Sequence, residues 1–188
     1  MVPNFISGKK VPFREKIYTF DGMKIGLISD THGFLHERIF HHFKDCDEIW
    51  HAGDVGDVSV IEQLEQFKPT RGVYGNIDDK TIQSIFPEEL ILEIEGVKIY
   101  MIHIGGTPPR YATGVRKRLE DIKPQLFICG HSHILKVMAD DSLGKMLYMN
   151  PGAAGNHGFH QVRTLLRFDL EAGRIKNLEV IELGKRGM

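Results

Sequence analysis

The sequence contains little cysteine and no long apolar run. Its two cysteines, Cys46 and Cys129, do not form a disulfide framework or a zinc knuckle, so we expect reduced thiols in a cytoplasmic chain. No segment approaches the roughly 18 apolar residues that cross a bilayer, and the start of the chain lacks the apolar core of a signal peptide. We therefore expect no membrane partner.

Blocks of like charge are also missing. The formal net charge is −1 and the pI about 6.8, which argues against extended nucleic acid as a partner. What stands out instead is histidine, with ten copies in 188 residues, several of them beside glycine or aspartate. A chain of this length is expected to form one domain over residues 23–188. Residues 1–22 show no periodicity and are expected to be an N-terminal extension.

The first half of the domain alternates strands with amphipathic helices. Strands are predicted over residues 25–28, 48–51 and 72–74, and helices over 35–44 and 58–67. This order is typical of a parallel sheet with crossover helices.

Antiparallel pairing dominates the second half. Residues 89–95 and 97–102 predict a hairpin around the turn at Glu95–Gly96, and residues 110–121 predict a polar helix. Further strands are predicted over residues 125–129, 135–139, 146–149, 163–169 and 174–181. Together the two halves suggest two sheets packed face to face with helices outside.

Five of the predicted strands end in side chains that can bind a metal, each beside a glycine. These side chains are Asp30, His32, Asp54, Asn76, His103, His131 and His133. Any one of them is explained as well by a helix cap or a turn. Five successive strand ends of the same kind instead favour a metal site at one edge of the fold.

The chemistry of this set indicates which metals it suits. Two carboxylates, one amide and four imidazoles exceed the ligands of a single zinc, and they fit two ions that share a carboxylate. The nitrogen content is too high for Mg²⁺ or Ca²⁺. We expect two divalent ions, Mn²⁺ in the first place, with Fe, Zn²⁺ or Ni²⁺ as alternatives.

The spacing of these residues resembles the calcineurin-like metallophosphoesterases, and most of all the small single-domain phosphodiesterases of the YfcE type. The motifs are Asp30–x–His32, Gly53–Asp54, Gly75–Asn76, His103 and Gly130–His131–x–His133, and the resemblance covers about residues 23–183. It implies an α/β (α+β) fold, a four-layer αββα sandwich of two mixed β-sheets flanked by helices.

The resemblance also implies roles for these residues. Asp30, His32 and His133 would hold one ion, Asn76, His103 and His131 the other, and Asp54 would bridge them. The implied reaction is phosphoester hydrolysis by a hydroxide that bridges the two metals. Four positive charges less two aspartates match a hydroxide and a phosphodiester monoanion, so the expected substrate is a small phosphodiester. Oligomeric state is left open, including a homo-oligomer.

Asp78 and His103 are the candidate catalytic residues. In the wider family the Gly–Asn pair is usually followed by His, whereas here Ile77 and then Asp78 follow Asn76. Asp78 is interpreted as orienting His103 or another imidazole, as protonating the leaving oxygen, or else as capping the turn before Thr81.

The remaining histidines and the function of the protein allow further interpretations. His51 lies within an apolar strand and is expected to pack or to bond a neighbour rather than bind metal. His157 and His160 lie in a glycine-rich loop that either lines the site or is surface. The alternative function is a catalytically weak scaffold similar to the retromer subunit of this fold.

Overall fold

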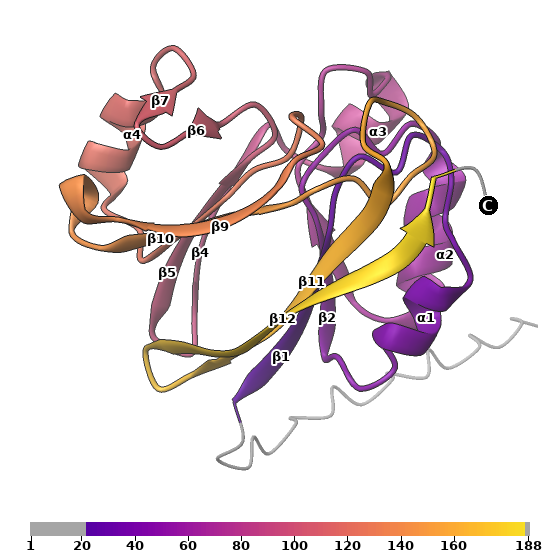
Figure 1. The fold of residues 1–188 in the computed structure, drawn as a ribbon, viewed down its shortest axis with the longest axis horizontal. Coiled ribbons are helices and arrows are strands. Elements are labelled where there is room, and N and C mark those ends of the chain that lie inside the picture. The colour runs from indigo at the N-terminus through magenta and orange to yellow at the C-terminus, as the bar shows by residue number, and fades with distance from the viewer. Residues whose placement is uncertain (1–21, 187–188) are drawn as a thin grey trace, which may run out of the picture.

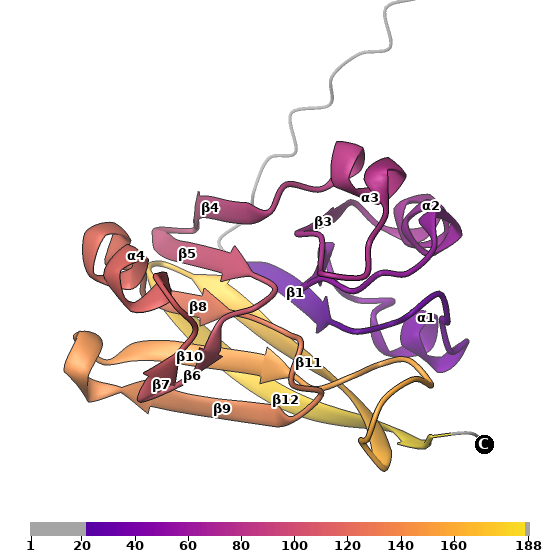
Figure 2. The ribbon, with the colours of Figure 1, turned by 90° about the horizontal axis from the view of Figure 1, so that it is seen from above.

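The computed structural model describes residues 22–186, so the expected extension over residues 1–22 lies almost wholly outside the described residues. Two five-stranded sheets pack face to face, and helices cover their outer faces (Figures 1 and 2). This is the four-layer arrangement expected from the sequence. Within residues 22–186, no helix is both long and apolar enough to span a membrane.

The first sheet has the strand order β12-β11-β1-β2-β3. Its strands are β1 (Met23–Ile28), β2 (Glu48–His51), β3 (Thr70–Gly72), β11 (Val162–Glu171) and β12 (Arg174–Lys185). Strands β1, β2 and β3 are parallel, and β11 is antiparallel to β1. The outer face packs against α1 (Arg38–His42), α2 (Val58–Phe67) and α3 (Lys80–Ile85) through a cluster that includes Ile39, Leu64 and Ile82.

The second sheet has the order β4-β5-β8-β10-β9. Its strands are β4 (Glu89–Ile94), β5 (Val97–Ile102), β8 (Leu126–Ile128), β9 (Leu135–Asp140) and β10 (Met146–Pro151). Helix α4 (Val115–Ile122) covers its outer face through Val115, Leu119 and Ile122. A small hairpin, β6 (Gly106–Thr107) and β7 (Arg110–Tyr111), and a 3₁₀ turn, η1 (Asp141–Leu143), complete this half.

The main core lies between the two sheets. Ile25, Leu27 and Trp50 of the first sheet meet Ile99 and Ile128 of the second, and all are fully buried. Burial of large apolar side chains is the dominant stabilising contribution to such a sandwich. The core fixes how the two sheets face each other, and therefore how the loops at their ends meet.

Several predicted boundaries are wrong for identifiable reasons. The helix expected from residue 110 starts at Val115, because Arg110–Tyr111 pairs instead with Gly106–Thr107. The strand expected over residues 72–74 is instead Thr70–Gly72, because Thr70–Gly72 pairs with β2. The Tyr74 amide donates a hydrogen bond to the Pro87 carbonyl, outside the sheet. Helix α1 is shorter than the predicted 35–44, and α3, capped by Asp79, is not among the predicted elements.

Candidate metal centre

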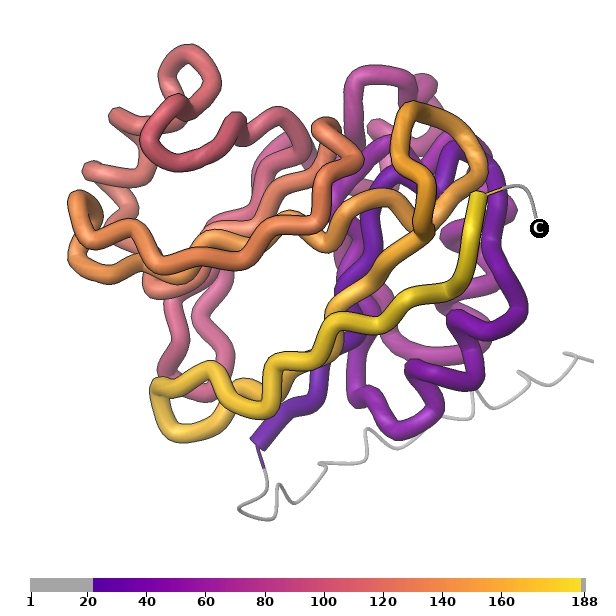
Figure 3. The backbone as a smooth tube through the Cα atoms, in the orientation of Figure 1, coloured from indigo at the N-terminus to yellow at the C-terminus, as the bar shows by residue number. Residues whose placement is uncertain are grey.

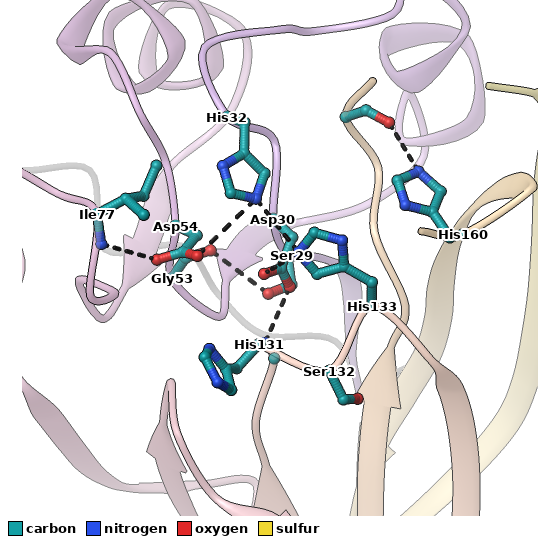
Figure 4. A network of polar contacts seen from close by, with 12 residues as sticks. Ser29, Asp30, His32, Gly53, Asp54, Ile77, His131, Ser132, His133 and His160 are labelled. Carbon is teal, nitrogen blue, oxygen red and sulfur yellow. Dashed lines mark hydrogen bonds and ion pairs between the residues drawn. The ribbon is translucent and has the colours of Figure 1, made fainter. Parts of the chain in front are cut away.

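The loops after β1, β2, β5 and β8 bring the candidate ligands together at one edge of the sandwich. Figure 4 shows those from the loops after β1, β2 and β8. One group, whose ligand atoms all lie within 4.8 Å of one another, contains Asp30, His32, Asp54 and His133. A second group with the same spacing contains Asp54, His103 and His131. Asp54 belongs to both groups, so the two groups of candidate ligands share one carboxylate.

In the first group the imidazole nitrogens converge on the two carboxylates. His32 Nε2 lies 3.2 Å from His133 Nε2 and 3.8 Å from Asp54 Oδ2, and His133 Nε2 lies 3.1 Å from Asp30 Oδ1. The backbone amide of His131 donates to Asp30 Oδ2 at 3.1 Å, which ties the loop after β8 to the loop after β1. Burial, the largest influence, lowers the pKa of His32, so this ring favours the neutral form that ligates metals.

In the second group the tautomer of His103 is set by the backbone. Its Nδ1 lies 2.7 Å from the Ala52 carbonyl oxygen, which can only accept, so Nδ1 carries a proton and Nε2 faces Asp54 Oδ1 at 3.1 Å. Asn76 lies beside His103 in the lining of a cavity of about 190 Å³. The structure thus places the predicted amide ligand next to the second position.

Charge and hydrogen bonding at the cluster fit a bound cation. Among residues 22–186, the buried atoms Asp30 Oδ1 and His103 Nε2 make no hydrogen bond, although buried polar atoms nearly always have a partner. Burial alone would lower the pKa of His103 and raise that of Asp54, yet their mutual contact raises the first and lowers the second. Both shifts show that the pair favours positive charge between them, which a metal ion would supply.

Backbone conformation is unusual at most of the candidate ligands. Five candidate ligands have left-handed backbones: Asp30 (φ 54°), His32 (48°), Asp54 (54°), His131 (67°) and His133 (56°). Residues other than glycine adopt this region at an energetic cost, and such residues cluster at functional sites. In the turns Asp30–x–His32 and His131–x–His133, both named residues have this left-handed conformation, and it allows alternate side chains to face the same cluster.

Glycine is required where two of these loops touch. A Cβ atom on Gly75 would lie 2.1 Å from Asp54 Oδ1, and one on Gly130 would lie 2.0 Å from Ser29 Oγ. Both distances are shorter than any real contact, so only glycine permits this approach of the loops.

Asp78 is buried and holds the loops around the second group. Its carboxylate accepts hydrogen bonds from the backbone amides of Gly75 (2.7 Å), Val55 (3.1 Å) and Gly56 (2.8 Å). The expected cap before Thr81 is made by Asp79 instead, and the His103 ring is oriented by Ala52. The predictions that Asp78 caps this turn or orients His103 are therefore wrong. Its three hydrogen bonds to backbone amides make Asp78 a positioning residue for the loops.

His51 does not face the metal positions, in line with the expectation that it bonds a neighbour. Its Nδ1 accepts from the Gly53 amide at 3.2 Å, so Nε2 carries the proton and donates to Thr31 Oγ1 at 2.9 Å. The Thr31 hydroxyl then donates to the Val55 carbonyl at 2.9 Å. This buried chain of hydrogen bonds connects the loops that carry Asp30 and Asp54.

We predict that His51 makes the metal-free protein less stable in acid. Burial lowers the pKa of His51 from 6.5 to about 3, so the unfolded chain takes up a proton that the folded chain excludes. Stability should fall as the pH drops from about 6.5 towards 3, by up to about 1.4 kcal/mol per pH unit. Urea unfolding with EDTA at pH 5.5 and 4.5 should show a steeper loss for the native protein than for His51→Gln. Equal slopes would contradict this prediction.

The loop after β10 packs over the first group. The His157 ring lies 4.9 Å from that of His32, and the His160 ring 5.4 Å from that of His133. His160 Nε2 contacts the Gly155 carbonyl at 3.0 Å, whereas His157 is exposed (Figure 4 shows His160). Of the two readings of this loop, the structure supports the one in which it lines the site.

Comparison with known proteins agrees with the site. Residues 23–173 match the family model described as the calcineurin-like phosphoesterase superfamily domain. A probable metallophosphoesterase of Methanocaldococcus jannaschii is 33% identical over 140 residues, which is 70% of this chain and 68% of the relative.

Solved structures share the fold. A conserved Streptococcus pneumoniae protein described as a predicted phosphoesterase aligns with a TM-score of 0.64 at 20% identity, over 87% of this chain and 91% of the other. Vps29 of Entamoeba histolytica, in complex with zinc, aligns with a TM-score of 0.62 at 17% identity, over 85% of this chain and 99% of the other. At these identities both comparisons concern the fold alone.

Proposed function

The chain belongs to the calcineurin-like phosphoesterase superfamily, and from this premise we propose that it is a phosphodiesterase that uses two divalent metal ions. The observation that carries the proposal is Asp54, whose carboxylate belongs to both groups of ligand side chains. Asp30, His32 and His133 would hold one ion with Asp54. Asn76, His103 and His131 would hold the other.

The chain's own residues prepare the site before any substrate binds. When bound, the two ions would lower the pKa of a shared water and offset charge on the phosphoryl oxygens. Ala52 keeps the Nε2 lone pair of His103 directed at the second position, and Asp78 fixes the loop that carries Asn76. Preorganised ligands of this kind avoid a cost of reorganisation during the reaction.

Charge balance supports a diester over a monoester. Asp30 and Asp54 are the carboxylates among the described ligands, so two divalent ions leave two positive charges there. A hydroxide and a phosphodiester monoanion neutralise these charges, whereas a monoester dianion leaves an excess negative charge. Mn²⁺ is the proposed metal because the ligand set mixes imidazole with oxygen.

A catalytically weak scaffold is the second candidate, and the Vps29 structures of the same fold are what favours it. Against it, each of the seven ligand positions in this chain holds a residue that can bind a metal. The scaffold reading predicts a folded protein that hydrolyses no phosphoester at any metal loading.

Metal removal and a substrate screen test the proposal. We expect elemental analysis to find two Mn, Fe or Zn ions per chain after loading, and we expect EDTA to abolish hydrolysis of bis(p-nitrophenyl) phosphate. Saturating Mn²⁺ should restore it and raise the free energy of unfolding by about 2.7 kcal/mol for each bound ion, at 100 times the Kd of that ion. A preference for p-nitrophenyl phosphate would contradict the diester assignment, and metal binding without turnover of either ester would favour the scaffold.

A further inference from the structure

A cavity of about 190 Å³ lies beside the second metal position. Its lining includes both Asn76 and His103, together with Tyr74, Glu88 and Ile104. Ile77, which follows Asn76, lies on the side of the cluster away from His160 (Figure 4). A phosphodiester held at the two metal positions would therefore have this cavity within reach of one of its two alcohol substituents.

The cavity has apolar walls and one acidic group. Tyr74 supplies an aromatic ring, and Ile102 and Ile104 supply aliphatic surface, with Ile104 41% exposed. Glu88 is the carboxylate of the lining, and burial together with the negative charge of Glu88 raises the pKa of Tyr74. An aromatic face next to a carboxylate is a favourable environment for an organic cation.

The cavity continues away from the metal positions. Glu88 and Ile102 also line a second cavity of about 360 Å³, which reaches Glu89 and Arg118. There the Arg118 Nε donates to Glu89 at 3.2 Å and the Tyr100 hydroxyl donates to Glu89 at 3.0 Å, so the charge of Glu89 is balanced. Within residues 22–186 Glu88 forms no ion pair, which leaves its negative charge available to a ligand.

We propose that this cavity, defined by Tyr74, Glu88 and Ile104, is a subsite for a positively charged alcohol substituent of the substrate, such as an amino alcohol. The inference rests on the proposed phosphodiesterase function and names the class of its substrate. The apolar body of the substituent packs on Tyr74 and Ile104, and its ammonium group faces Glu88. A substituent with a second negative charge is disfavoured by repulsion from Glu88.

Binding of three phosphate monoesters to the Mn²⁺-loaded protein tests the subsite by calorimetry. The probes are phosphocholine, ethyl phosphate and 2-carboxyethyl phosphate, which differ in the charge of their one substituent. We expect phosphocholine to bind about fivefold tighter than ethyl phosphate, the scale of an exposed charge pair, and 2-carboxyethyl phosphate to bind weakest. Glu88→Gln should remove this preference and Glu88→Lys should reverse it, while Tyr74→Ala should weaken phosphocholine binding by about threefold.

Glu93→Gln is the matched control. Glu93 is an exposed glutamate of β4, the strand that directly follows Glu88, and it lines neither cavity. It should bind the three probes as the native protein does. Turnover of bis(p-nitrophenyl) phosphate is measured in parallel on every variant. If diesters are hydrolysed but the order of the probes is the same in native protein and Glu88→Lys, the subsite is overturned. If no diester is hydrolysed, it is the proposed function that fails.

Discussion

Asp54→Asn is expected to lower Mn²⁺-dependent turnover of phosphodiesters by at least about 100-fold and to remove at least one of the two bound ions. Among the described residues, Asp54 is the one whose side chain belongs to both ligand groups. A neutral amide offers one oxygen and no charge, so it is a poor bridge between two cations. Steady-state kinetics and metal content per chain measure the two effects.

The same substitution should leave the fold intact. Asn tolerates the left-handed φ of 54° at this position at least as well as Asp does. Because contact with His103 outweighs burial and lowers the pKa of Asp54, the metal-free variant is expected to lose some stability while keeping its fold. Asp45→Asn, at an exposed residue after α1, is the control and should keep full activity. An active Asp54→Asn protein with two ions would show that the bridging role is wrong.

Gly75→Ala is expected to reduce turnover by about 100-fold without removing any ligand side chain. The added Cβ would lie 2.1 Å from Asp54 Oδ1 and 2.3 Å from the Asp54 amide nitrogen. Because a backbone atom is among these contacts, the clash is not relieved by a side-chain rotation, and the loop carrying Asp54 has to move. Metal titration should show a 10- to 100-fold weaker affinity, the scale seen when groups that support metal ligands are disturbed.

Gly144→Ala separates this effect from a general loss of stability. Gly144 has a φ of 73°, so alanine there costs roughly 1 kcal/mol in backbone strain, but a Cβ at that position meets no atom within 4 Å. The control should therefore unfold at lower temperature and keep its kcat and metal affinity. Equal metal affinity in Gly75→Ala and the native protein would refute the close approach of the two loops.

Periodicity in the sequence predicted most of the elements because apolar residues must face a core at regular intervals. Residues 58–67 and 97–102 were predicted with the observed boundaries of α2 and β5. The predicted start of α4 at residue 110 is wrong, because pairing between β6 and β7 competes with helix formation around Arg110. Short elements such as β3 and α3 depend on neighbours remote in sequence, which periodicity does not report.

By itself, the sequence determined which residues can bind metal, because their chemistry and their glycine neighbours recur at successive strand ends. The family resemblance implied how they are grouped, and the tertiary structure supplies the physical reason, since Asp54 lies within reach of the candidate ligands of both groups. The tertiary structure alone decided the roles of Asp78 and His51. Asp78 accepts from the amides of Val55 and Gly56, 23 and 22 residues away, and His51 bonds the Thr31 hydroxyl, 20 residues away. Backbone amides and left-handed turns carry no side-chain signature, so these contacts exist only once the chain has folded.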